Sequence, residues 1–588
     1  MRPGSVVNVS KEVIERMILV PQAKIDDYTA RGWWGSVTLW DVFVKNVSDQ
    51  PDAEAVVDAP NRSDFAPGRA RRLTWAQLAA EVDAFSLQLL DKGIKRDAVL
   101  VMQLPNCVEQ FVVYLSCARL GVIVSPVPVQ YREHELAQVL HTTQAAAAVT
   151  FARIGMAGST HQAALMFAGL QTEHAALKAV LVWDDFTSHA LSEDDLQVLK
   201  HAELVAKVTA NDVFTICWTS GTEAQPKGVP RSHNEWLVVA PSIIEAADIK
   251  RHARLLNPFP LVNMAGLSTA FASWLVLGGT VVQHQPFSLP VFLLQLRDEK
   301  IDYTVAPPAI LNMLLQNEAL LEGIDFKRLC RIGSGSAPLS DWMVRGFEEK
   351  HGVQIVNYFG SNEGAALSGN HIDIPDAALR AEFFPRAGVA GYDWSVSTTR
   401  KIKTRLVDLL TGQDITTTGT PGELRFAGPT IFSGYYASPE LSQRAFDIQG
   451  FYKTGDLFEI AGDRLQYYRY VGRSKDLVIR GGVNISPEEI ENLLLACPGV
   501  REAAVVGVPD DVLGEKVCAC IVASTGEQVT LESLNAFLTN HKRIARYKLP
   551  EYFLALTALP RNPVGKILKR ELREQAKVLA VYIQKEVA

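Results

Sequence analysis

Apolar runs rich in β-branched residues alternate with amphipathic helical stretches along roughly the first 470 residues of the chain. Residues 98–104 predict a strand, residues 108–120 a helix and residues 122–127 a further strand. A similar order returns between residues 254 and 282. Such alternation favours parallel α/β layers, and its recurrence predicts two similar α/β halves. At 588 residues, the chain is also too long for a single hydrophobic core.

The texture of the sequence changes near Pro421, where short strands and glycine turns predict a small antiparallel region. A compact unit follows Arg473. It contains a helix that begins at Ser486-Pro487, strands at 502–508 and 517–523, and a helix from about Leu531. We therefore expect an N-terminal domain over residues 1–473 and a C-terminal domain over residues 474–588.

Composition excludes several classes of protein. A net charge of −7 and a pI near 6.0 argue against a nucleic-acid partner, which requires a basic footprint. No run approaches the ~20 apolar residues of a membrane span, and the N-terminus lacks a secretory pattern. The seven cysteines include a C-x-C at Cys518 and Cys520 without the second pair that zinc needs. We expect buried thiols in a cytoplasmic protein.

A loop of small hydroxyl residues and glycine, TSGTEAQPKG at residues 219–228, follows an apolar run at 213–218. Glycine lets backbone N–H groups turn toward phosphate oxygens, hydroxyls donate further bonds, and Lys227 adds a point charge. The loop is not a Walker A motif, because its lysine precedes glycine. Taken alone, it is equally compatible with an ordinary surface turn.

Three further segments have chemical potential but are weak signals when taken singly. Residues 357–364 place an aromatic residue beside glycine and a carboxylate that can hold Mg²⁺. Asp456, with Arg473 nearby, can accept ribose hydroxyls, although both also lie in turn-forming sequences. Lys566 follows a Pro/Gly-defined loop near the C-terminus, where a solvated basic stretch is the alternative.

Together, the order and spacing of these segments resemble the adenylate-forming superfamily of acyl- and aryl-CoA ligases, nonribosomal adenylation domains and beetle luciferase. The resemblance spans residues 73–572, and it includes GSGSAP at 333–338, Gly434-Tyr435 and GGVNISPEEIE at 481–491. It implies an α/β fold with a large N-terminal domain of two α/β subdomains and a small β-barrel-like subdomain. A small, mobile α+β C-terminal domain would follow.

The resemblance also implies a role for each matching residue. Glu363 matches the Mg²⁺ carboxylate, Lys475 the hinge and Lys566 the lysine required for adenylation. Gly481 and Gly482 would line the path of coenzyme A. The loop that holds the β- and γ-phosphates of ATP would comprise Thr219, Ser220, Gly221, Thr222 and Lys227. The remaining contacts to ATP or AMP would come from Ala337, Asn357, Phe359, Gly360, Asn362, Asp456 and Arg473.

The implied chemistry activates a carboxylic acid. Attack of the carboxylate on the α-phosphate of ATP converts a poor leaving group into AMP, but it brings two anions together. Lys566 and the Mg²⁺ at Glu363 would offset this repulsion, with Thr219 as the third catalytic residue. One such preorganised donor is worth ~3–4 kcal/mol in the transition state. Rotation at Lys475 would then exchange Lys566 for the glycine pair and admit the thiol.

The sequence departs from the family pattern at four places. Glu223-Ala224 replaces Thr-Gly in the phosphate loop. Asn362 replaces the usual Thr or Ser, and its amide can still donate a hydrogen bond to the phosphate. Asn263 stands where many members have a histidine. Residues 391–401 form an altered or lengthened loop.

The expected acyl pocket contains small or neutral side chains and no cation that could recognise an α-amino acid. Its residues would be Asn263, Met264, Gly266, Gly333, Ser334, Gly335, Ser336 and Ser361. The segments Gly32-Trp33-Trp34 and 230–234 resemble the branch that activates aryl and cyclic acids. We therefore expect an uncharged hydrophobic acid, which is aromatic, alicyclic or a larger ring system.

Three hypotheses follow for the function. The first is an acid–CoA ligase that uses ATP, Mg²⁺ and coenzyme A. The second is a stand-alone activating enzyme that loads the phosphopantetheine of a carrier protein, and the motifs separate these two poorly. The third, a non-catalytic nucleotide-binding relative, is disfavoured because Glu363, Asp456 and Lys566 occur together. Whether the protein forms a homodimer stays open.

Overall fold

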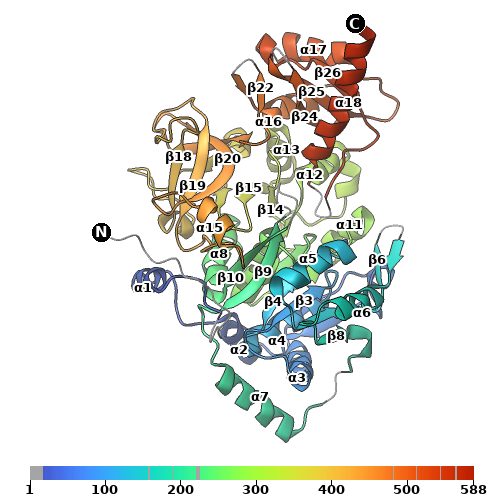
Figure 1. Ribbon diagram of the computed structural model, residues 1–588, viewed down its shortest axis with the longest axis vertical. Helices are drawn as coiled ribbons and strands as arrows, with labels where there is room; N and C mark the ends of the chain where they lie inside the picture. Colours follow the sequence, from blue (N-terminus) through green and yellow to red (C-terminus); the bar gives the residue numbers. More distant parts are fainter. Residues whose placement is uncertain are drawn as a thin grey trace.

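The computed structural model describes residues 17–156, 159–187, 190–219, 226–480, 483–510, 513–542, 544–562 and 566–587. Two α/β layers form the lower and middle parts of the molecule in Figure 1, with a small antiparallel sheet at one side and the C-terminal unit above them. The α/β fold class expected from the resemblance is confirmed. No helix in the described part of the chain is long and apolar enough to span a membrane.

The first layer is a six-stranded sheet in the order β10-β9-β4-β3-β5-β8. Its inner strands are parallel, whereas β9 and β10 form an antiparallel hairpin. Helix α4 is buried along its whole length, because it packs between this sheet and neighbouring helices. The elements are β3 (Val99–Gln103), α4 (Val108–Leu120), β4 (Ile123–Pro126), α5 (Glu133–Thr143), β5 (Ala147–Thr150), α6 (Ala163–Glu173), β8 (Ala179–Val182), α7 (Glu193–Ala206), β9 (Val213–Thr219) and β10 (Lys227–Ser232).

The second layer is an eight-stranded sheet in the order β16-β15-β14-β13-β11-β12-β1-β2. Its inner strands are parallel, as the sequence pattern predicts, and its edge strands β2 and β16 are antiparallel. The strands are β1 (Glu54–Val57), β2 (Arg72–Thr74), β11 (Arg254–Asn257), β12 (Thr280–Gln283), β13 (Tyr303–Val305), β14 (Arg331–Gly335), β15 (Gln354–Gly360) and β16 (Ala366–Gly369).

Helices between and around these sheets bury the largest core. Trp75 of α3 stacks on Trp274 of α10 with ring centroids 4.8 Å apart, which joins the two layers. The helices are α1 (Gln22–Ala30), α2 (Leu39–Asp49), α3 (Trp75–Asp91), α8 (His233–Ala246), α9 (Met264–Gly266), the π-helical turn η3 (Leu267–Ala272), α10 (Ser273–Leu277), α11 (Leu289–Asp298), α12 (Pro308–Gln316), α13 (Asp341–His351) and α14 (Ala377–Glu382).

The small antiparallel sheet begins earlier in the chain than Pro421, where the pattern of short strands and glycine turns predicts its start. Its order is β17-β21-β20-β19-β18, so it already recruits residues before Pro421. The unusual loop at 391–401 connects its first two strands and carries the short turn η5 (Ser397–Arg400). The elements are β17 (Phe383–Pro385), β18 (Lys403–Val407), β19 (Gly422–Ala427), α15 (Pro439–Ala445), β20 (Tyr452–Ala461) and β21 (Tyr467–Arg473).

A second compact unit follows, with its own five-stranded sheet and cores. Ser486 caps the first helix as predicted, because its Oγ accepts a hydrogen bond from Glu489 N at 3.2 Å. Cys518 and Cys520 are buried in the core that faces α18, and all seven cysteines are free. The elements are β22 (Val478–Arg480), β23 (Val483–Ile485), α16 (Pro487–Leu495), β24 (Val500–Asp510), β25 (Gly514–Ala523), α17 (Leu531–Asn540), β26 (Tyr552–Ala555) and α18 (Lys569–Val587).

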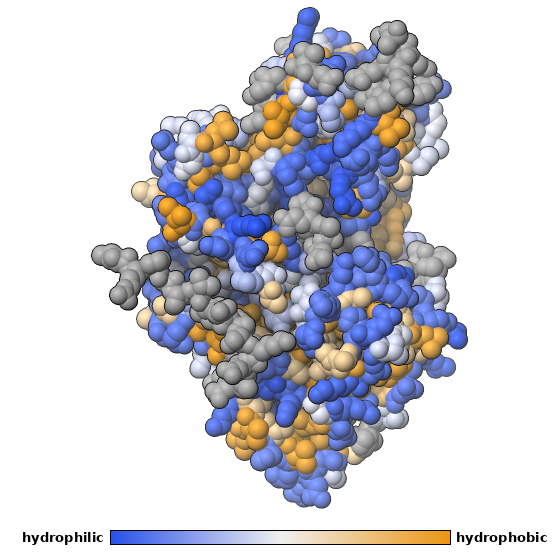
Figure 2. Space-filling view, viewed as in Figure 1, coloured by the Kyte–Doolittle hydropathy of each residue, from blue (hydrophilic) through white to orange (hydrophobic). Residues whose placement is uncertain are grey.

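The molecular surface is mixed. Figure 2 shows hydrophilic residues over most of one face, with apolar patches toward the lower end, where α7 projects in Figure 1. Leu204 and Val205 of this helix are 72% and 66% exposed.

Candidate active site

Several predicted site residues lie at the carboxyl ends of strands. Thr219 ends β9, and Gly335 and Gly360 end the neighbouring parallel strands β14 and β15. Ala337 is exposed two residues beyond β14, after Ser336, whose backbone has the left-handed φ of 69°. Ligands of open α/β sheets bind outside the carboxyl ends of strands, so each of the two sheets presents predicted site residues at such an end.

The phosphate loop is the connection of the β9–β10 hairpin, because Thr219 pairs directly with Lys227 across the two strands. Ser220, Gly221 and Thr222 lie outside the described residues, as do Glu223 and Ala224 of the altered sequence. The Nζ of Lys227 is 5.4 Å from the centroid of the Tyr435 ring. Because the Tyr435 hydroxyl also contacts Glu363, three residues beyond β15, the hairpin places a cation close to the end of that strand.

Glu363 is buried at 7% exposure beside this hairpin. The Tyr435 hydroxyl donates a hydrogen bond to its Oε1 at 2.9 Å, and Phe432 N donates to its backbone oxygen at 2.9 Å. Within the described residues no group of three or more His, Cys, Asp or Glu is arranged to hold a metal. A single carboxylate fits Mg²⁺, which takes few protein ligands and completes its shell with phosphate oxygens and water.

Asn362 connects the phosphate hairpin to the expected acyl region. Its Nδ2 donates to Trp218 O at 3.2 Å, and its Oδ1 accepts a hydrogen bond from Met264 N at 2.7 Å. One Nδ2 hydrogen is already bonded to Trp218 O. The expected contact between Asn362 and a phosphate could therefore use only the other Nδ2 hydrogen. The structure adds a different role, since this amide joins β9 to the start of α9.

Arg231 stabilises the loop that follows β15, which contains Asn362 and Glu363. Sequence reasoning did not assign this role. Its guanidinium is fully buried and donates to the backbone oxygens of Asn362 at 3.2 Å and Thr430 at 2.9 Å. Gly364 is required here, because it has a φ of 96° and a Cβ would collide with Thr430 O. The only sequence signal was the unusual Pro-Arg-Ser-His-Asn at the end of β10.

Asn357 and Phe359 lie on β15 in different surroundings. Asn357 is buried, and its Nδ2 donates to the carbonyls of Arg380 at 3.2 Å and Ala381 at 2.9 Å, so only Oδ1 could receive an adenine amino group. The half-buried Phe359 ring packs edge-on against Phe458 at 5.0 Å. The contact between these two rings thus joins the end of β15 to β20 of the small β sheet.

Asp456 and Arg473 face each other across β20 and β21. Arg473 Nε lies 2.9 Å from Asp456 Oδ1 as an ion pair, but without hydrogen-bond alignment, so this buried oxygen has no hydrogen-bond partner within the described part of the chain. Burial raises the pKa of Asp456, while the charges of Arg473 and Lys566 oppose that shift. A buried carboxylate with an unused acceptor is suited to ribose hydroxyls.

Lys566 of the C-terminal unit lies within electrostatic reach of this pair. Its N–H donates to Asn562 Oδ1 at 2.8 Å, and Asn562 N donates to Lys566 O at 2.8 Å, which closes a loop whose residues 563–565 lie outside the description. Lys566 retains exposed surface, yet desolvation by the surrounding protein and the charge of Arg473 lower its pKa to about 8. The attractive charge of Asp456 acts in the opposite direction.

The expected acyl residues are held by close backbone packing. A Cβ on Gly333 would collide with the Tyr303 hydroxyl, which lies 3.2 Å from the hydroxyl of Tyr358. Gly266 allows its helix start to approach Pro260 O, and Asn263 caps that helix by accepting from Gly266 N at 3.3 Å. Met264 is buried, Gly335 packs against the backbone of β15, and the Ser361 Oγ is a buried hydroxyl without a partner among the described residues.

The expected hinge lies between the two sheets. Lys475 is exposed, and Arg573 of α18 donates to its backbone oxygen at 3.4 Å and to Asp476 Oδ1 at 2.7 Å. Gly481 and Gly482 lie outside the described residues, between the paired residues Arg480 and Val483.

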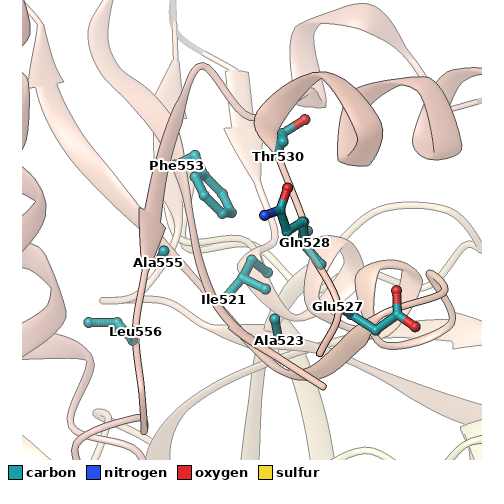
Figure 3. Close-up of a pocket in the computed structure, with 9 residues that line it drawn as sticks. Ile521, Ala523, Glu527, Gln528, Thr530, Phe553, Ala555 and Leu556 are labelled. Atoms are coloured by element: carbon teal, nitrogen blue, oxygen red, sulfur yellow. The ribbon is translucent and has the colours of Figure 1, made fainter. Parts of the chain in front are cut away.

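A cavity of about 360 Å³ in the C-terminal unit is separate from all of these residues. Figure 3 shows its mostly apolar lining, with the Glu527 carboxylate directed away from the centre. It contains none of the predicted site residues. Its lining comprises Ile521, Ala523, Glu527, Gln528, Val529, Thr530, Phe553, Ala555 and Leu556.

This fold and site are those of an adenylate-forming enzyme. Residues 43–436 match the family described as AMP-binding enzyme, and residues 489–566 match the AMP-binding enzyme C-terminal domain. The chain therefore belongs to the AMP-binding enzymes, and the resemblance stated from the sequence is confirmed.

Relatives match along nearly the whole chain. A medium-chain fatty-acid–CoA ligase of Escherichia coli (strain K12) is 28% identical, over 93% of this chain and 92% of that protein. A 2-hydroxy-7-methoxy-5-methyl-1-naphthoate–CoA ligase of Streptomyces carzinostaticus is 30% identical, over 93% and 95%. The solved structure of the anthranilate CoA ligase AuaEII in complex with anthranoyl-AMP shares the fold, with a TM-score of 0.76, 20% identity and coverage of 93% and 98%.

Proposed function

We propose that the protein is an AMP-forming acid–CoA ligase, which converts an acid, ATP and coenzyme A into acyl-CoA, AMP and pyrophosphate. The observation that carries this proposal is the buried Asp456–Arg473 ion pair, whose charges act on Lys566 of the C-terminal unit. Lys566 would supply the cation from the C-terminal unit, and Asp456 would hold the ribose. Membership of the AMP-binding enzymes supports the reaction class.

In the first half-reaction, a carboxylate oxygen of the acid attacks the α-phosphorus of ATP. A new P–O bond forms, and the bond between the α-phosphorus and the bridging oxygen breaks, so that pyrophosphate leaves with the electron pair. Lys566 would stabilise the charge on the α-phosphoryl oxygens, while Thr219 and Lys227 would hold the β- and γ-phosphates. Mg²⁺ held by Glu363 would supply further positive charge to the polyphosphate.

In the second half-reaction, the thiol sulfur of coenzyme A attacks the acyl carbon, the thiol loses its proton, and AMP leaves. Lys566 has no task in this step. We propose that the chain pivots at Lys475, with the domain boundary at residues 473/474, so that Gly481 and Gly482 replace Lys566 at the site. Support comes from sheet organisation, because β21 ends at Arg473 and the next sheet begins at Val478.

We propose that the substrate is a hydrophobic acid with an uncharged acyl group that is aromatic, alicyclic or a larger ring system. The expected pocket residues carry no charge, and the space beside Gly333 is occupied by the rings of Tyr303 and Tyr358. Two phenols at this position favour a flat or cyclic acyl group over a long chain. The names of the relatives include both an aromatic naphthoate and medium-chain fatty acids.

A panel of acids tests the proposal when pyrophosphate exchange, AMP release and thioester formation are measured together. AMP release with acyl-CoA formation, in the absence of any carrier protein, supports the ligase. Adenylate formation without turnover of coenzyme A, but with loading of a carrier's phosphopantetheine, would favour the carrier-loading alternative. Activity confined to α-amino acids would overturn the substrate class.

A further inference from the structure

One short segment, residues 432–436, contacts both the carboxylate expected to hold metal and the start of the phosphate hairpin. Phe432 N donates a hydrogen bond to the backbone oxygen of Glu363 at 2.9 Å. The Tyr435 hydroxyl donates to Glu363 Oε1, also at 2.9 Å. Tyr436 N donates to Gly228 O at 2.8 Å. The segment therefore ties Glu363 and β10 together through three hydrogen bonds.

The Tyr435 side chain is itself held in place. Tyr435 N donates to Ser442 Oγ at 2.9 Å, and this hydroxyl donates to Ser438 O at 2.8 Å. The Phe432 ring packs edge-on against the Tyr435 ring at 4.9 Å. Close approach of Ser442 also requires Gly434, because a Cβ there would lie 2.8 Å from the Ser442 Oγ. The phenol is thus preorganised rather than free to rotate.

The same side chain faces the cation of the phosphate hairpin. Lys227 Nζ lies 5.4 Å from the centroid of the Tyr435 ring, within the range at which an ammonium is attracted to an aromatic face. One residue thereby contacts a cation with its ring and a carboxylate with its hydroxyl. A purely structural tyrosine would not need both charged partners.

We propose that Tyr435 is a positioning residue, which orients Glu363 toward Mg²⁺ and Lys227 toward the terminal phosphates of ATP. The inference rests on the proposed function. Because the phenol occupies Oε1, Oε2 is the oxygen that would bind the metal. Hydrogen-bonding partners of metal ligands typically change metal affinity or activity by about 10–100-fold when they are removed.

Calorimetric titration of the full-length protein with ATP, in the presence of Mg²⁺ or of EDTA, tests the role of Tyr435. Tyr435→Phe keeps the ring and loses the hydroxyl, so it should weaken binding of MgATP about 10-fold or more and leave metal-free ATP binding unchanged. Tyr435→Leu also removes the ring beneath Lys227, and should weaken metal-free binding as well. The neighbouring substitution Tyr436→Phe is the matched control and should change neither value.

Glu363→Gln and the double variant Glu363→Gln/Tyr435→Phe complete the test. If the hydroxyl acts through Glu363, the double variant should bind MgATP no more weakly than Glu363→Gln alone. The inference would be overturned if Tyr435→Phe weakened ATP binding equally with and without Mg²⁺, or if the effects in the double variant were fully additive. Either result would leave the proposed function intact. Unchanged MgATP binding in Glu363→Gln would instead reject the metal role of Glu363 in the proposed function, and the inference with it.

Discussion

Asn362 accepts a hydrogen bond from Met264 N at 2.7 Å and donates one to Trp218 O at 3.2 Å, so a single side chain spans the phosphate hairpin and the expected acyl region. The two backbone groups belong to elements that meet only in the folded chain. In the adenylate-forming reaction, the acid must meet the α-phosphate, and we expect this amide to set the spacing of the two proposed binding regions.

Replacement of Asn362 should therefore affect both substrates together. Asn362→Ala removes two hydrogen bonds of about 0.5–1.5 kcal/mol each and leaves part-buried backbone groups unpaired. We expect lower stability and raised KM values for both ATP and the acid in steady-state assays. Asn362→Asp retains an acceptor for Met264 N but loses the donor to Trp218 O. It should therefore raise the KM for ATP more than the KM for the acid. If Asn362→Ala changed the KM for the acid alone, the role of Asn362 in linking the two binding regions would be contradicted.

Lys566 is expected to act in only one of the two proposed half-reactions. Lys566→Ala should lower pyrophosphate exchange by about 100–1,000-fold, because it removes a preorganised donor from the transition state. Thioester formation from a synthetic acyl-adenylate should remain near the wild-type rate. Arg570→Ala, an exposed neighbour in the same segment, is the control. Parallel loss of both half-reactions would contradict the assignment.

The pH profile of adenylation should report the protonation of Lys566. The pKa of about 8 means that the lysine is charged below pH 8 and loses its proton as the pH rises through that value. Pyrophosphate exchange, measured as kcat/KM for ATP, should therefore be constant below pH 8 and fall above it.

A substitution identifies the titrating group. Lys566→Arg should shift the fall beyond pH 10, since the guanidinium stays charged there. A profile that does not fall up to pH 9.5, or one that Lys566→Arg leaves unmoved, would show that another group controls adenylation.

Gly364 combines two constraints that can be separated by mutation. Its φ of 96° disfavours a side chain, and its Cβ would collide with Thr430 O and approach Arg231. Gly364→Ala should destabilise the protein by about 3 kcal/mol or more, measured by chemical denaturation. Gly388→Ala, at a φ of 77° with open space around it, should show only the backbone strain of about 1 kcal/mol. Equal losses in the two variants would exclude the steric contribution.

Local sequence patterns predicted the local structure well. The strands at 98–104 and 122–127, the helix at 108–120 and the cap at Ser486 depend on periodicity and on neighbouring residues, and each occurs as expected. Sheet membership could not be predicted in this way. Strands β1 and β2 join the sheet of β11–β16, and β17 and β18 pair with strands beyond Pro421.

The sequence by itself determined the chemistry that the chain can support, because adenylation needs a lysine, a metal carboxylate and a ribose acceptor in a recognisable order. It also determined the helices and strands that carry them. Only the tertiary structure decided which groups meet. Tyr435 reaches Glu363 across 72 residues, and Arg231 reaches Thr430 across 199. Contacts between such distant positions leave no periodic signal, since they arise from packing of whole elements.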